Sequence, residues 1–228
     1  MRVRIFLTLS AILLLVTIAM DLLLIPSLAS VQNKDLIQYS PIFYWHIPVA
    51  WVALFAFLCV FMASIAYLWK RTPFWDIVAT TSAELGVVFT TLFLLTGSIW
   101  AKFAWGTWWA WDARLTSSLV LWIIYVAYFL LRAYISSPEQ RARFAAVFGI
   151  LGFVDVPIVI LTLFVSNQMH PGDAAFHLDK PQMIITLVTG VVAFTVLYLA
   201  LFFFVIHLKE DAAEITELKN LMEDDDNE

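Results

Sequence analysis

Residues 100–114 read WAKFAWGTWWAWDAR and hold five of the chain's ten tryptophans. Apolar segments at 77–99 and 115–134 flank this stretch, and each is long enough to cross a bilayer. An ordinary aromatic belt at a membrane interface needs far fewer tryptophans. A surface so dense in indole rings is better suited to stacking against a large, flat, apolar partner. Gly106, in the middle of the stretch, permits a sharp turn or a close approach.

The composition is that of a polytopic membrane protein. Of the 228 residues, 62% are hydrophobic and 14% charged, and the mean hydropathy is +0.88. A soluble domain could not bury that much apolar surface. Because an isolated span must satisfy its own backbone hydrogen bonds, the sequence predicts an all-α membrane protein, a bundle of six transmembrane helices. The spans are predicted at 5–26, 43–69, 77–99, 115–134, 144–167 and 183–207.

The basic residues orient these spans. By the positive-inside rule, nine Lys and Arg on one side against four on the other place both termini in the cytoplasm. The nine are Arg2, Arg4, Lys70, Arg71, Arg132, Arg141, Arg143, Lys209 and Lys219, and the four are Lys34, Lys102, Arg114 and Lys180. The outer loops are then 27–42, 100–114 and 168–182, and we expect function to lie there.

Charge also divides the chain into a body and a tail. Nine of the eighteen acidic residues lie in 209–228, whereas 1–208 holds eleven Lys and Arg against nine Asp and Glu. We predict one six-helix transmembrane domain over 1–208 and an acidic, flexible cytoplasmic tail over 209–228. The chain has no soluble basic face, which argues against nucleic acid as a partner. The start MRVRIF is interpreted as the beginning of a retained first span.

Two of the four histidines lie at similar depth on the outer side. His46, in FYWHIPVAW, is just inside the outer end of the second span, and His170, in NQMHPG, is just past the outer end of the fifth. Imidazoles on two helices can bind an iron from opposite faces of a porphyrin. The alternative is that each is a polar interface residue. His177 is more typical of a solvated loop, and His207 of an anchor at the inner interface.

Other polar groups of the outer face leave alternatives open. A structural zinc commonly takes four ligands with thiolates or several imidazoles, and the outer face offers at most three histidines and no cysteine. Arg114 suits a bound carboxylate such as a haem propionate, or an interface pair with Asp112. Lys102 is typical of a snorkelling lysine.

Ionisable residues at membrane depth suggest function by default, because burying them is costly. For Glu84 and Asp155 we predict hydrogen bonds between helices or contact with another subunit, since no chain of titratable groups links them across the bilayer. Pro157, close to Asp155, predicts a kink in the fifth span. Asp21 and Asp76 also fit positions near the interfaces.

WGTWWAWDARLTS (105–117) resembles the signature of the WWD-motif family of haem-handling membrane proteins. Within that family, six spans and this length match the haem exporter protein C group. FYWHIPVAW (43–51) and FVSNQMHPG (164–172) resemble its two ligand regions, and the resemblance covers about residues 40–210.

The resemblance implies haem b, bound without a covalent link, with His46 and His170 as axial ligands of its iron. It implies a haem-facing loop that comprises Trp105, Gly106, Trp108, Trp109, Trp111, Asp112 and Arg114. The site would lie on the periplasmic side of a bacterial inner membrane, surrounded by membrane lipid. The implied partners are an ABC transporter (cytochrome c maturation proteins A and B), the small membrane protein D and a periplasmic haem chaperone, protein E. The chain would then be a scaffold and not an enzyme. Whether it also takes part in attaching haem to the chaperone stays open.

Two other classes of protein stay open on the residues alone. A cytochrome b-like electron-transfer protein would also use two histidines on separate helices. It usually packs haem between helices, often with a second haem at another depth, whereas only His207 lies on the inner side here. A membrane subunit of an ABC transporter would need no cofactor of its own.

Overall fold

The structure is a computed structural model of the chain, and it describes residues 2–32, 41–164, 178 and 180–225. Within these ranges every regular element is a helix, so the predicted all-α class is confirmed. The helices are α1 (Arg2–Gln32), α2 (Phe43–Lys70), α3 (Pro73–Trp105), α4 (Ala113–Tyr134), α5 (Pro138–Gly152), α6 (Asp155–Leu161) and α7 (Pro181–Asp225).

The six predicted spans are confirmed by six stretches that are long and apolar enough to cross a membrane. They are Arg4–Ile25, Phe43–Lys70, Pro73–Phe103, Ala113–Tyr134, Pro138–Leu161 and Pro181–Thr216. The third begins earlier than predicted because Pro73, with its fixed φ, starts α3. The fifth is built from α5 and α6 together.

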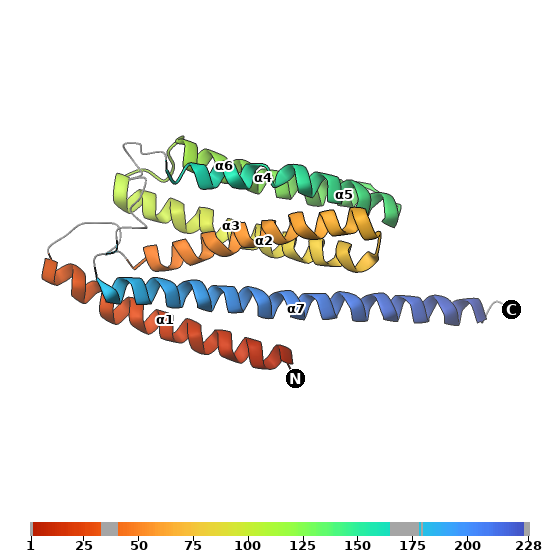
Figure 1. Cartoon of the computed structure of the whole chain (residues 1–228), viewed down its shortest axis with the longest axis horizontal. Coiled ribbons are helices and arrows are strands. Elements are labelled where there is room, and N and C mark those ends of the chain that lie inside the picture. Colours follow the sequence, from red (N-terminus) through yellow and green to blue (C-terminus); the bar gives the residue numbers. More distant parts are fainter. Residues whose placement is uncertain (1, 33–40, 165–177, 179, 226–228) are drawn as a thin grey trace.

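The helices form three groups (Figure 1). α1 pairs with α7 on one side, α4, α5 and α6 lie on the other, and α2 and α3 lie between them. α2 and α7 approach closely where Gly190 faces α2. A Cβ at this glycine would lie 3.0 Å from Cγ of Pro48 and 3.2 Å from the carbonyl oxygen of Tyr44. Small residues allow this backbone contact between membrane helices.

Near Pro157, where the sequence predicts a kink, the helix of the fifth span is interrupted. The fifth span breaks at Phe153 and Val154, between α5 and α6. Pro157 has no N–H to donate to the carbonyl of Phe153, so the helix loses a bond at this point. Asp155 lies in the first turn of α6. Its Oδ2 is buried with no hydrogen-bond partner among the described residues, so the helix–helix bond expected there is not found.

Ion pairs join helices toward the end of the bundle opposite residues 106–112. Lys209 Nζ of α7 lies 2.8 Å from Glu84 Oε2 of α3, which confirms the contact between helices predicted for Glu84. The guanidinium of Arg132 donates to both carboxylate oxygens of Asp76, at 2.6 and 2.9 Å, and so joins α4 to α3. Such a bidentate pair fixes orientation as well as distance.

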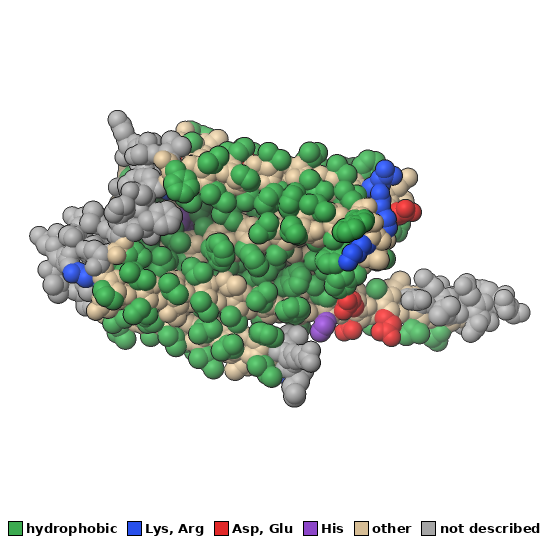
Figure 2. Space-filling view, in the orientation of Figure 1, with side chains coloured by type: hydrophobic (Ala, Val, Ile, Leu, Met, Phe, Trp, Pro, Cys, Tyr) green, Lys and Arg blue, Asp and Glu red, His purple; other side chains and the backbone are tan. Residues whose placement is uncertain are grey.

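Apolar side chains cover the face of the bundle between its two ends, and most of the Lys and Arg visible on this face gather at one end (Figure 2). This is the arrangement that the positive-inside rule requires if that end faces the cytoplasm. The orientation of the termini stays a prediction. α7 continues past this end as a helix to Asp225 (Figure 1). The predicted tail therefore begins inside a helix, and its flexibility is likewise a prediction.

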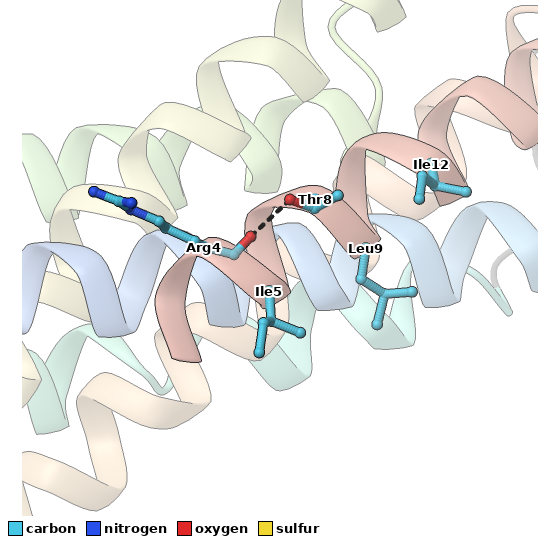
Figure 3. Close-up of a pocket in the computed structure, with 5 residues that line it drawn as sticks. All are labelled: Arg4, Ile5, Thr8, Leu9 and Ile12. Carbon is cyan, nitrogen blue, oxygen red and sulfur yellow. Dashed lines mark hydrogen bonds between the residues drawn. The ribbon is translucent and has the colours of Figure 1, made fainter. Parts of the chain in front are cut away.

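A hollow of about 750 Å³ lies along the surface of α1 near its N-terminal end (Figure 3). All of its lining residues come from this one helix: Arg4, Ile5, Thr8, Leu9 and Ile12. The Thr8 hydroxyl donates to the Arg4 carbonyl at 2.8 Å, so it is already satisfied within the helix. The hollow therefore offers no convergent polar groups, and the candidate site lies at the other end of the bundle.

Candidate functional site

His46 lies in the first turn of α2 and packs against α3. Its backbone N–H donates to the carbonyl of Ile42 at 2.9 Å, which holds it within the helix. Its ring nitrogen Nδ1 is 3.0 Å from the hydroxyl oxygen of Thr96. Its ring stacks on Phe93, with centroids 4.6 Å apart and planes at 28°. One polar and one aromatic contact therefore fix the imidazole against α3.

The imidazole lies at the same end of the bundle as the tryptophan-rich stretch. Gly97 of α3 leaves room for it, since a Cβ at this position would lie 3.0 Å from Cε1 of His46. Gly106, which ends α3, is nine residues further along the helix. At a rise of 1.5 Å per residue this corresponds to about 14 Å along the axis.

Trp45, the neighbour of His46, joins three helices. Its indole Nε1 donates to Asp21 Oδ2 of α1 at 2.7 Å, and its ring packs edge-on against Phe194 of α7 with centroids 5.7 Å apart. Asp21 is only 1% exposed. Because a carboxylate at membrane depth is costly, the sequence marked Asp21 as a residue that needs a partner. It did not predict that the partner is Trp45.

α3 continues further than the sequence predicted. We predicted an outer loop over 100–114, whereas the helix runs to Trp105, so that only 106–112 connect α3 to α4. No glycine or proline lies between Gly97 and Gly106, and Gly106 ends α3 in the left-handed region at φ 74°. The Gly106 N–H donates to the carbonyl of Lys102 at 3.1 Å, and Lys102 Nζ donates to the carbonyl of Gly106 at 2.9 Å. Lys102 thus stabilises the helix end.

Replacing Gly106 by Ala should destabilise the protein by about 1–2 kcal/mol, the cost of the left-handed region for an L-residue with a side chain. A Cβ there meets nothing within 4 Å, so the cost comes from the backbone alone. Chemical unfolding of the purified variant in detergent measures it. Gly106→Asn is the matched control and should cost less, because Asn tolerates this conformation. An alanine variant as stable as the wild type would contradict the assigned conformation.

Residues 106–112 present indole rings at the surface of the protein. Trp108 is 59% exposed and Trp111 is 78% exposed. Trp109 is half-buried and packs edge-on against Trp111, with ring centroids 5.8 Å apart. The Thr107 hydroxyl donates to the carbonyl of Trp109 at 3.0 Å and so braces the turn. At the end of α3, the rings of Trp100 and Trp105 also meet edge to face, at 4.7 Å.

Asp112 and Arg114 begin α4. The Asp112 side chain accepts from the N–H of Leu115 at 2.8 Å and caps the helix, a role that the sequence analysis did not predict. Arg114 Nη2 donates to the carbonyl of Thr162 at 3.2 Å, just past the end of α6. The cap fixes where α4 starts and therefore how Arg114 projects.

Two buried donors at this end lack an acceptor among the described residues: Trp109 Nε1 and Arg114 Nε. An unsatisfied buried donor costs about 1–3 kcal/mol, so each such group calls for an explanation. A ligand that carries carboxylates would supply acceptors, and a flat apolar ring would cover exposed indoles. Haem has both features, and His46 offers an imidazole, so the residues present fit this group. In the described part of the chain no three His, Cys, Asp or Glu side chains come together, so the zinc alternative gains no support there.

His170 and His177 lie outside the described residues. The segment that contains them begins after Phe164, close to Thr162 and its contact with Arg114. Beyond it, Leu178 packs against the cluster that includes Phe43, Tyr44 and Met183. The described residues nearest to both ends of this segment thus lie at the end of the bundle that holds His46. The ligand role of His170 remains a prediction.

The fold and this end of the bundle define a multi-pass helical membrane protein, with a histidine braced against α3 at the same end as a tryptophan-rich turn. Residues 1–224 match the family described as Heme exporter protein C, and the chain belongs to this family.

Curated relatives include three proteins named Heme exporter protein C. The chain is 35% identical to that of Bradyrhizobium diazoefficiens over 165 residues, which cover 70% of this chain and 62% of the relative. It is 32% identical to that of Rhodobacter capsulatus over 166 residues, 70% of this chain and 68% of the relative. It is 34% identical to that of Escherichia coli (strain K12) over 133 residues, 58% and 54%. The matched region thus spans less than two thirds of two of these relatives.

Proposed function

We propose that the chain binds haem b without a covalent bond at the outer face of a bacterial inner membrane. It presents the haem for transfer to a periplasmic haem chaperone in cytochrome c biogenesis. The observation that carries the proposal is the pair of exposed indole rings, Trp108 and Trp111, at the same end of the bundle as His46. Membership of the Heme exporter protein C family supports it.

Different residues of this end of the bundle would bind the iron, the ring and the propionates of the haem. His46 and His170 would be the axial ligands of the iron. Trp105, Gly106, Trp108, Trp109 and Trp111 would form the apolar platform against the ring. Arg114 and the indole N–H of Trp109 would donate to the propionates, because both carry a buried donor atom with no acceptor among the described residues. Asp112 would act through the start of α4, which it caps.

An exposed platform suits delivery better than permanent retention. Trp111 is 78% exposed, so haem stacked on it would keep an edge accessible to a second protein. Transfer then needs an exchange of iron ligands but no opening of a closed cavity. In this proposal the chain is a scaffold and not an enzyme. It works with the ABC transporter formed by cytochrome c maturation proteins A and B and with the small membrane protein D, and cytochrome c maturation protein E accepts the haem.

The test uses the full chain, expressed with ample haem and purified in detergent. We expect haem to copurify, with an absorption spectrum typical of two imidazole ligands, and to move to added apo-chaperone. Haem per protein and haem delivered are both measured. Protein without pigment would contradict the proposal and favour a membrane subunit with no cofactor. Haem that cycles between redox states but is never delivered would favour a cytochrome b-like protein.

A further inference from the structure

The contact between His46 and Thr96 bears on which ring nitrogen of His46 carries the proton. Thr96 Oγ1 lies 2.8 Å from the carbonyl oxygen of Leu92 and 3.1 Å from that of Phe93. A hydroxyl has a single hydrogen, and both carbonyl oxygens are placed to accept it. With that hydrogen on a helical carbonyl, the Thr96 oxygen accepts from Nδ1 of His46 at 3.0 Å. In this arrangement a neutral His46 carries its proton on Nδ1.

We infer that Thr96 is a positioning residue that holds His46 in the Nδ1–H tautomer, so that Nε2 is the nitrogen that binds the haem iron. The choice of iron ligand atom rests on the proposed function, whereas the tautomer does not. In protein metal sites, the hydrogen bond made by the other ring nitrogen commonly fixes the tautomer of a ligating histidine. A ligand in the opposite tautomer would have to move its proton before it could coordinate.

Two further residues of α3 fix the plane of the same ring. Phe93 stacks on the imidazole, and Gly97 leaves the space that Cε1 occupies. Thr96 and Gly97 follow Phe93 by three and four residues, so both lie next to it on one side of α3. Contacts with these three residues therefore fix the orientation of the imidazole, and the contact with Thr96 selects its protonated nitrogen.

The test compares Thr96→Val with Thr96→Ser in the full chain. Valine keeps the branched shape but removes the acceptor, whereas serine retains the acceptor. In haem-free protein, nitrogen NMR of labelled histidine reports the tautomer, and the His46 signals are identified by their absence in His46→Ala. We expect Nδ1–H in the wild type and in Thr96→Ser, and a shift toward Nε2–H in Thr96→Val.

The haem-loaded protein gives a second readout. Loss of the hydrogen bond should lower haem affinity by about 10-fold or more, as for other partners of metal ligands. It should also raise the midpoint potential, because an imidazole that donates to no acceptor is a weaker donor to ferric iron. Thr96→Ser, which keeps the hydroxyl, should show neither change. If Thr96 acted only through its methyl group, serine, which lacks that methyl, would show both changes.

Two results would overturn the inference. One is an Nε2–H tautomer at His46 in the haem-free wild type, whatever the protein does with haem. The other is a Gly97→Ala variant whose tautomer shifts as far as in Thr96→Val, since this change crowds the ring but leaves the acceptor in place. The proposed function fails separately, if His46→Ala leaves the haem spectrum of the loaded protein unchanged while the Nδ1–H tautomer of the wild type is confirmed.

Discussion

Replacing His46 and His170 together by Ala should remove most of the haem from the purified protein. Loss of a single hydrogen-bond partner of a metal ligand already costs about 10–100-fold in affinity, so loss of both axial ligands should exceed this. Each single variant should retain part of its haem, because the indole rings still stack on the macrocycle, but should show a shifted absorption spectrum. Haem per protein and the spectrum of each variant are the measurements.

His207→Ala is the matched control for the histidine variants. His207 lies on α7 with its side chain 64% exposed and 3.6 Å from Glu210, toward the end opposite residues 106–112, so its loss should leave haem binding unchanged. His177→Ala should also behave like the wild type, and loss of haem there would make His177 a ligand in place of His170. A double His46 and His170 variant with a wild-type spectrum would refute the assignment of both ligands.

The elements that the sequence predicted are those governed by local properties. Length and apolarity place the six spans, because a membrane helix must satisfy its backbone within itself. Pro157 breaks the fifth span because it lacks a donor, and Glu84 pairs with another helix because a charge at depth needs a partner. In each case the feature follows from the chemistry of a single residue or of one continuous apolar run.

The features that were missed depend on contacts between distant residues. The sequence placed His46 near the outer end of its span, but it did not predict that Thr96, fifty residues away, binds its ring. The same holds for Asp21 and Trp45, which are twenty-four residues apart. The end of α3 was misplaced for another reason. Tryptophans near an interface suggested a loop, whereas the backbone stays helical until Gly106 forces a left-handed turn.

Replacing Trp108 and Trp111 together by Ala should weaken haem binding strongly. Both rings are exposed and therefore available for stacking. Each aromatic contact contributes about 0.5–1.5 kcal/mol beyond burial, so the pair should cost roughly 1–3 kcal/mol. This corresponds to about 5–150-fold in affinity, with some departure from additivity because the residues are close in the chain. Single changes to Phe, which keep an aromatic face, should have modest effects.

Trp69→Ala separates stacking on haem from a general effect of losing exposed tryptophans. Trp69 is 83% exposed and lies near the end of α2 remote from His46, so its loss should change neither haem content nor delivery. The Trp108 and Trp111 double variant should lose both, and its delivery to apo-chaperone should fall even after correction for haem content. The reason is that the exposed rings would also form the surface on which the chaperone docks around the haem edge. If haem content and delivery both stay at wild-type levels, residues 106–112 are an aromatic belt at the membrane interface and not a haem platform.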